Sequence, residues 1–282
     1  MSSLAEVLGF APGARVLVVT CDELGFSHAS NLGVYGALRG GSATSASLMV
    51  PAPWSRGAAA AYRGEDVGAH LTLNSELDLY RWGPLTHSPS LLDGDGGFPR
   101  TVEDVWAHAD VDEVRREWRA QVERAILWGF DVSHLDVHLE GVELKPEFFD
   151  VYLELAEELR LPVRLPGVEE QRRVGFPFRE LAAERGIVSP DRVLPLQALL
   201  GHAPTLLDAL GSLPPGVTEV HAHPAVDMPE LRASAPDWEE RVAEHRLLTS
   251  GGSFSAALGG AGVHLVGYRV LRRVMRETRP SR

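Results

Sequence analysis

The chain has 282 residues, of which 44% are hydrophobic, and its formal net charge is -12 at pH 7. This length and composition fit one large α/β domain, and the acidic charge argues against a protein that binds nucleic acid or a membrane surface, because phosphate recognition needs clustered Lys and Arg. A single cysteine, Cys21, excludes an internal disulfide framework and a cysteine-rich zinc site.

The first ten residues, MSSLAEVLGF, contain neither a basic segment nor a long apolar segment of the kind that directs secretion. No apolar stretch of the chain approaches the roughly 20 residues that cross a bilayer. We therefore expect a cytoplasmic protein with no membrane span and no nucleic-acid partner.

The first predicted strand, residues 15–21, is followed by an acidic pair, Asp22 and Glu23, and then by Gly25. Proteins with parallel sheets place their chemistry at the carboxyl ends of the strands, where this pair lies. Two adjacent carboxylates repel each other and lose solvation when they are buried. A cation, a proton or a histidine is therefore expected beside them.

Further apolar runs alternate with amphipathic segments, which is typical of βα units. Helices are predicted at residues 111–128 and 146–160, because apolar side chains recur there at spacings of three and four. The pattern predicts a parallel sheet or barrel within a single domain covering residues 1–282, with a frayed tail at 272–282. The remaining predicted strands are residues 42–50, 66–73, 133–139, 162–165, 192–195, 216–222 and 263–268.

The stretch from residue 74 to residue 100 is rich in Gly, Pro, Ser and Asp and has no sustained periodicity. Long loops of this kind in compact domains usually serve a function, and Tyr80, Trp82 and Phe98 give this one more apolar surface than a linker needs. We expect a lid or groove wall over residues 74–104 that contacts the substrate. Its apolar side chains could also pair two copies across a two-fold axis, so a homodimer is one expected assembly.

Histidines recur near the carboxyl ends of the predicted strands. In SHLDVHLE, strand alternation places His134, Asp136 and His138 on one face. Taken singly, each histidine fits a hydrogen-bonded structural role better than a ligand role, but their convergence with the acidic pair predicts a metal site. The five histidines are His70, His134, His138, His221 and His223.

Two imidazoles and one carboxylate would leave coordination positions of a metal open to water and substrate, as hydrolytic centres need. A second carboxylate nearby can take a proton from water, and a further histidine can protonate a leaving group. The residue inventory therefore predicts a hydrolytic metal centre.

Several segments in a fixed order resemble the YdjC-like (ChbG/HpnK) carbohydrate deacetylases, metal-dependent enzymes that remove an acetyl group from N-acetylated sugars. The resemblance implies a distorted (β/α) barrel of about seven parallel strands, similar to a TIM barrel. The segments are VVTCDELGFSHASNLGVYGAL, TSASLMV, GAHLTL, WRAQVERAILWG, SHLDVH, PVRLP, EVHAHPAVD and VHLVGYRVL.

Carried over by position, the resemblance implies that Asp22 is the general base and that His223 protonates the departing amine. It also implies that one divalent metal ion is held by Glu23, His70 and His138. Magnesium and zinc both fit a mixed set of imidazole and carboxylate ligands, so the sequence leaves the metal open.

Three further residues are expected to support this site. Arg164 matches an arginine of the family that could orient Asp22 or bind substrate. His134 and Asp136 are expected to orient His138 or Asp22 through hydrogen bonds. By contrast, His221 and Cys21 are expected to be structural.

The chain departs from the family pattern in two places. The family normally has two aspartates where this chain has Asp22 and Glu23, so the second carboxylate reaches one methylene further or could point to solvent. After SHLDVH the family often continues with further histidines, whereas this chain continues LEGVE. Two alternatives therefore stay open: a metal hydrolase of the same fold that acts on a non-sugar amide or ester, and a sugar-binding protein without catalysis.

Overall fold

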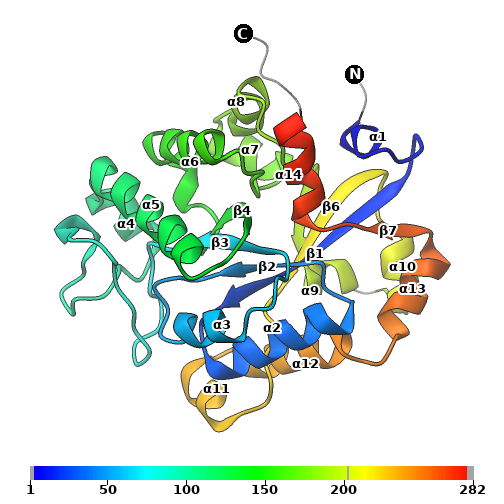
Figure 1. Ribbon diagram of the computed structural model, residues 1–282, viewed down its shortest axis with the longest axis horizontal. Coiled ribbons are helices and arrows are strands. Elements are labelled where there is room, and N and C mark those ends of the chain that lie inside the picture. The colour runs from blue at the N-terminus through cyan, green and yellow to red at the C-terminus, as the bar shows by residue number, and fades with distance from the viewer. Residues whose placement is uncertain (1–2, 202, 278–282) are drawn as a thin grey trace.

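The computed structural model describes residues 3–201 and 203–277. A curled sheet of parallel strands occupies the centre, and helices pack around it (Figure 1). Its strand order is β4-β3-β2-β1-β6-β5, with β7 paired to β1. The predicted α/β fold with about seven parallel strands is confirmed, and the sheet forms a half-barrel. The strands are β1 Arg15–Leu24, β2 Ser45–Leu48, β3 Val67–Leu71, β4 Val132–Val137, β5 Arg192–Pro195, β6 Gly216–Ala222 and β7 Val263–Leu265.

The helices surround the sheet on several sides, with α2, α3 and α12 along one side of it and α4, α5 and α6 beyond β3 and β4 (Figure 1). None of the described helices combines the length and apolar character that a membrane crossing requires. The helices are α1 Leu4–Val7, α2 His28–Gly40, α3 Ser55–Ala61, α4 Val102–His108, α5 Val111–Leu127, α6 Pro146–Leu159, α7 Val168–Val174, α8 Phe178–Glu184, α9 Leu196–Leu200, α10 Leu206–Gly211, α11 Pro229–Ser234, α12 Trp238–Leu248, α13 Ser253–Ala261 and α14 Tyr268–Glu277, with 3-10 turns η1 Pro89–Leu91 and η2 Val142–Leu144.

Two predicted segments differ from the structure. Residues 162–165 make one parallel bridge, between Val163 and Leu135, instead of a strand. The flanking Pro162 and Pro166 lack the N–H groups that a longer ladder would need. Residues 272–277, expected to fray, belong to α14, whereas residues 278–282 lie outside the described part of the chain.

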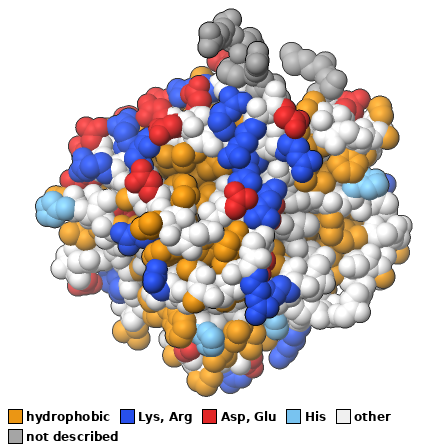
Figure 2. All heavy atoms as spheres, viewed as in Figure 1, with side chains coloured by type: hydrophobic (Ala, Val, Ile, Leu, Met, Phe, Trp, Pro, Cys, Tyr) orange, Lys and Arg blue, Asp and Glu red, His pale blue; other side chains and the backbone are white. Residues whose placement is uncertain are grey.

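Helix α14 is held against the sheet by its basic side chains, which gather on the face seen in Figure 2. Arg272 donates hydrogen bonds to both carboxylate oxygens of Asp131, at 2.7 and 2.8 Å, and to the carbonyl oxygen of Val132. Met275, one turn later in the helix, is buried. These contacts explain why the chain stays helical beyond residue 271.

Strand β1 contains an irregularity at the acidic pair. Its register with β2 shifts between Cys21 and Leu24, and Glu23 has φ 60°, in the left-handed region that non-glycine residues rarely adopt. In a regular strand, adjacent side chains point to opposite faces. Because of the shift, Asp22 and Glu23 both reach the histidines at the edge of the sheet.

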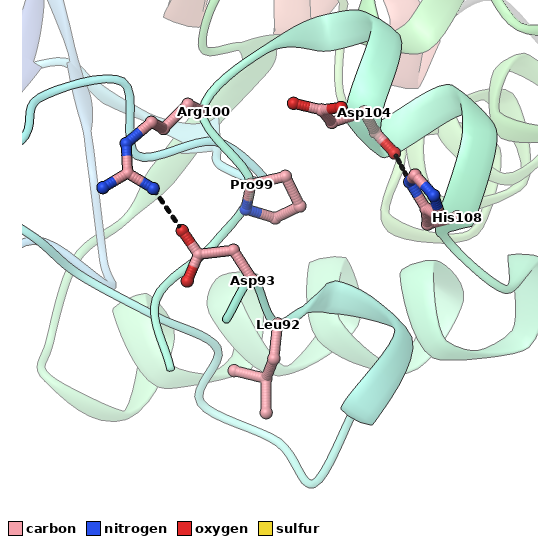
Figure 3. A pocket seen from close by; sticks show the side chains of 6 residues that line it. All are labelled: Leu92, Asp93, Pro99, Arg100, Asp104 and His108. Atoms are coloured by element: carbon pink, nitrogen blue, oxygen red, sulfur yellow. Dashed lines mark hydrogen bonds and ion pairs between the residues drawn. The ribbon is translucent and has the colours of Figure 1, made fainter. Parts of the chain in front are cut away.

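The segment expected to be a lid packs closely onto the domain. Trp82 and Phe98 are buried, and Glu117 of α5 accepts backbone hydrogen bonds from Leu85 and Thr86. A surface cavity of about 330 Å³ lies where the end of this segment meets α4 (Figure 3). None of the site residues predicted from the sequence lines this cavity, which is formed by Leu92, Asp93, Pro99, Arg100, Asp104 and His108.

Helix α2 approaches the loop after β6 at Gly33, and this contact yields a stability prediction. A Cβ at position 33 would lie 2.2 Å from the carbonyl oxygen of Pro224, which is far below van der Waals contact. We expect Gly33→Ala to destabilise the fold by about 1–3 kcal/mol, measured by chemical unfolding. Gly40→Ala, in the same helix with no heavy atom within 4 Å of the new Cβ, is the control. Equal stability of the two variants would contradict the prediction.

Candidate active site

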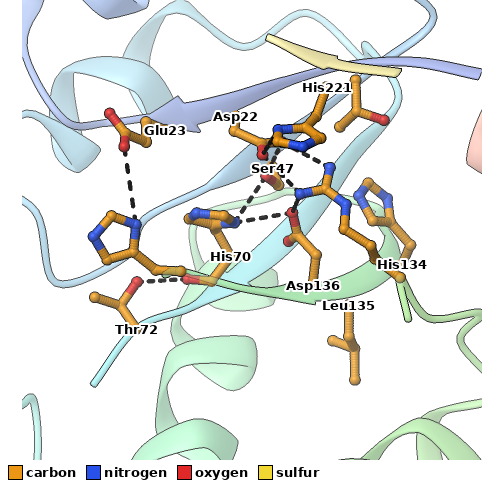
Figure 4. Close-up of polar contacts among 12 residues, drawn as sticks. Asp22, Glu23, Ser47, His70, Thr72, His134, Leu135, Asp136 and His221 are labelled. Carbon is orange, nitrogen blue, oxygen red and sulfur yellow. Dashed lines mark hydrogen bonds and ion pairs between the residues drawn. The ribbon is translucent and has the colours of Figure 1, made fainter. Parts of the chain in front are cut away.

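Polar side chains from the carboxyl ends of neighbouring strands meet at one edge of the sheet (Figure 4). The apolar runs that form β1, β3 and β6 end there, so their last residues leave the core and enter the site. His138 and Arg164 come from the segments that follow β4 and the Val163 bridge. The edge therefore concentrates acids and imidazoles from distant parts of the sequence.

Asp22 is held by Arg164. Both of its carboxylate oxygens accept hydrogen bonds from the guanidinium, Oδ2 at 2.7 Å and Oδ1 at 2.8 Å, and Ser47 donates a third bond at 3.2 Å. Burial alone would raise the pKa of Asp22, but Arg164 outweighs it and holds that pKa well below its usual range. The carboxylate is therefore ionised and fixed in orientation.

His70 contacts Asp136 through one ring nitrogen. Its Nδ1 lies 2.9 Å from Asp136 Oδ2 and 3.1 Å from Ser47 Oγ. Burial opposes the charged imidazolium, but the Asp136 carboxylate raises the pKa of His70 above its ordinary value. This contact orients the ring and leaves Nε2 as the nitrogen that can bind a metal ion.

Glu23 lies between the guanidinium of Arg241 and the imidazole of His138. Its Oε2 accepts a hydrogen bond from Arg241, and its Oε1 is 3.9 Å from His138 Nδ1. The other nitrogen of the His138 ring, Nε2, lies 3.0 Å from a carboxylate oxygen of Glu76, in the segment that follows β3. Although burial opposes ionisation, Arg241 holds the pKa of Glu23 well below its usual range. Ligand atoms of Glu23, Glu76 and His138 lie within 4.8 Å of one another, close enough to share a cation.

His221 and His223 complete the edge of the site on β6 and the following loop. His221 Nδ1 is 3.5 Å from Asp22 Oδ2, and its Nε2 is 3.6 Å from Glu140 Oε1. The backbone N–H of His223 donates to Glu244, whose pKa is raised by burial to about 7. Burial lowers the pKa of both histidines.

Comparison with known proteins places this chain in a family. The sequence pattern of the YdjC-like protein family matches residues 16–257, which include every site residue described above. The chain belongs to the YdjC-like family. The family resemblance expected from the sequence motifs is therefore confirmed.

This YdjC-like protein is similar over most of its length to two carbohydrate deacetylases and to one solved structure. It is 39% identical over 254 residues to the "Carbohydrate deacetylase" of Thermus thermophilus, an alignment that covers 87% of this chain and 90% of the relative. It is 31% identical over 263 residues to the "Carbohydrate deacetylase" of Geobacillus stearothermophilus, covering 90% and 97% of the two chains. A crystal structure from Enterococcus faecalis, described as a cellobiose-phosphate cleavage protein, superposes with a TM-score of 0.75 at 25% identity and covers 92% of this chain and 99% of that one.

The three expected metal ligands, Glu23, His70 and His138, do not form one compact group in the structure. His138 groups with Glu23 and Glu76, whereas His70 groups with Asp22 and Asp136. The two imidazole rings are nevertheless neighbours, with centroids 5.3 Å apart. Glu76, which the sequence analysis did not single out, lies beside two of the expected ligands.

The supporting roles expected for His134 and Asp136 require correction. Asp136 contacts His70 instead of His138. It is linked to Asp22 through its ion pair with Arg164 at 3.0 Å and through the contacts of His70 with Ser47. The ring of His134 stacks on Tyr268 with centroids 3.7 Å apart, and its hydrogen bond goes to Ser133. His134 lies two residues before Asp136 along β4, so it is further from the strand end where the site residues meet.

Sequence reasoning missed several residues of the site, among them Glu76, Ser47, His221, Glu219 and Arg241. His221, expected to be structural, contacts Asp22, and Glu219 contacts Arg164 at 2.8 Å. The spacing of TEVHAH could have indicated both, because positions 219, 221 and 223 share one face of a strand. Arg241 lies on α12, more than two hundred residues after Glu23, and no local pattern marks it.

Proposed function

We propose that this YdjC-like protein is a metal-dependent carbohydrate deacetylase that hydrolyses the acetamide of an N-acetylated amino sugar to acetate and a free amine. The observation that supports this most is the ionised Asp22, fixed by Arg164, beside the group formed by Glu23, Glu76 and His138. The names of the relatives from Thermus thermophilus and Geobacillus stearothermophilus point to the same activity.

The donor set fits one divalent cation. Two glutamates and His138 offer oxygen and nitrogen ligands within 4.8 Å of one another, and the ring of His70 lies beside that of His138. Glu23, His70 and His138 would hold the ion, with Glu76 within reach of the same imidazole. When bound, such an ion acts as a Lewis acid that acidifies water and polarises an acetyl carbonyl.

Residues of the chain accept and donate the protons of the reaction and orient the groups that do so. Asp22 takes the proton from the attacking water, and Arg164 holds both of its oxygens so that the carboxylate cannot rotate away. We assign the cation to Glu23 because its Oε2 accepts the hydrogen bond from Arg241 while its Oε1 faces His138 Nδ1 at 3.9 Å. His223 donates its own proton to the nitrogen of the departing amine, while Asp22 holds the proton taken from water. The products are acetate and an amino sugar, and after they leave Asp22 releases a proton to solvent and His223 regains one.

A direct test is acetate release from N-acetylglucosamine and its oligomers after chelation and reloading with zinc or magnesium. We expect His70→Ala and His138→Ala to lose at least about 100-fold in kcat/KM and to bind the ion more weakly, because each removes a ligand. His108→Ala, which changes an exposed histidine on α4, is the matched control and should match the wild type.

Three results would overturn the proposal. Full activity and metal content in both site variants would refute the ligand assignment. Hydrolysis of a non-sugar amide or ester, with no release from any N-acetylated sugar, would refute the substrate class. Tight sugar binding with no product under any metal would indicate a binding protein instead of an enzyme.

A further inference from the structure

Arg164 contacts three buried carboxylates, two through hydrogen bonds and one through an ion pair. Its Nη1 and Nη2 donate to Asp22 at 2.7 and 2.8 Å, and its Nε and Nη2 donate to Glu219 Oε1 at 3.1 and 2.8 Å. Its Nη1 also lies 3.0 Å from Asp136 Oδ2. A guanidinium is planar and has five N–H groups in a fixed arrangement. The position of one carboxylate therefore constrains the others.

Glu219 is the member of this cluster that faces away from the reaction. It is fully buried on β6, and its Oε1 accepts a hydrogen bond from Thr20 Oγ1 at 2.7 Å in addition to those from Arg164. Its Oε2 accepts a hydrogen bond from the hydroxyl of Tyr268 at 2.5 Å. Tyr268 is itself fully buried at the start of α14. Both carboxylate oxygens of Glu219 are therefore held by hydrogen bonds that do not involve Arg164.

We propose that Glu219 and Tyr268 are positioning residues that fix Asp22 through Arg164. Glu219 binds the Nε edge of the guanidinium, which prevents rotation about the Cδ–Nε bond and presents the Nη1–Nη2 edge to both oxygens of Asp22. Tyr268 supplies the hydrogen bond at Glu219 Oε2 and so determines how the carboxylate is turned. This inference rests on the proposed function, because it assigns a catalytic purpose to the orientation of Asp22.

The chain offers a matched pair of substitutions that separates positioning from stability. Tyr268→Phe removes the hydroxyl but keeps the ring that stacks on His134. Tyr35→Phe also removes a buried hydroxyl, one that donates to the carbonyl oxygen of Ala58 at 2.8 Å on α3. Both variants lose one buried hydrogen bond, and only the first lies in the Arg164 cluster.

With the zinc-loaded protein and an N-acetylglucosamine oligomer, we expect Tyr268→Phe to lower kcat about 10-fold or more, because small displacements of a catalytic group are costly. KM and the zinc dissociation constant should stay within about twofold of the wild type, since no expected ligand or substrate contact changes. Tyr35→Phe should lower the melting temperature similarly and leave kcat unchanged. An unchanged kcat in Tyr268→Phe, or an equal loss of kcat in both variants, would overturn the proposal.

A second readout does not depend on activity. In protein labelled with ¹⁵N-arginine, the Nε–H resonance of Arg164, identified by its change in Glu219→Gln, should shift in Tyr268→Phe and stay in place in Tyr35→Phe. If no N-acetylated sugar were hydrolysed by the wild type while this shift was seen, the proposed function would fail and the coupling of Tyr268 to Arg164 would stand. No shift in Tyr268→Phe would refute the coupling itself.

Discussion

Asp22→Asn is expected to lower kcat for acetate release by about 10²-fold or more while the fold is retained. The amide cannot accept the proton of the attacking water, and general base catalysis contributes effects of this size. Stability should persist because the cluster holds three carboxylates against the single guanidinium of Arg164, so neutralising one reduces repulsion among the rest. Steady-state kinetics and thermal unfolding of the same preparation would measure both effects.

Asp131→Asn is a suitable control for this substitution, because Asp131 also accepts two hydrogen bonds from one arginine, Arg272, outside the site. It should leave kcat unchanged. If Asp22→Asn kept more than a tenth of the wild-type kcat, Asp22 could not be the general base.

The second large expected effect is the loss of stability when Arg164, the guanidinium of the same cluster, is replaced. Arg164→Gln should reduce the free energy of unfolding by about 3–5 kcal/mol, because it leaves the carboxylates of Asp22, Asp136 and Glu219 buried without their shared partner. Denaturant unfolding monitored by circular dichroism would measure the loss, or show that the variant does not fold.

Arg232→Gln provides the comparison. Arg232 also binds a carboxylate through two nitrogens, both 2.7 Å from Asp227, but this pair is exposed to solvent. Its loss should cost much less, since water solvates the remaining carboxylate. Equal losses for the two variants would contradict the view that burial makes the Arg164 cluster sensitive.

Most of the sheet was predictable because β1, β2, β3, β4 and β6 are buried on both faces and therefore appear as short apolar runs. The ends of those runs also predicted that Asp22, His70 and His221 lie at one edge, since parallel strands deliver their last residues there. Strand alternation gave the face of each side chain. It could not give the bulge at Glu23, whose left-handed backbone arises from the shifted register with β2.

The contacts that fix the site were less predictable. Arg241 reaches Glu23 from α12, and Tyr268 reaches Glu219 from α14, but neither residue lies in a periodic pattern that marks it as polar and buried. Glu76 lies in a segment without periodicity, so its contact with His138 could be seen only once the chain had folded. These pairings depend on how helices and loops close over the sheet, which short-range patterns do not encode.

The Arg164 cluster also bears on how the chain folds. Its hydrogen bonds join residues that are 142 positions apart, for Arg164 and Asp22, and 199 positions apart, for Thr20 and Glu219. Contacts between such distant segments pay a large loop-closure entropy and form late. During refolding, helical structure should therefore return before the base is oriented, so a compact intermediate with most of its secondary structure would still be catalytically silent.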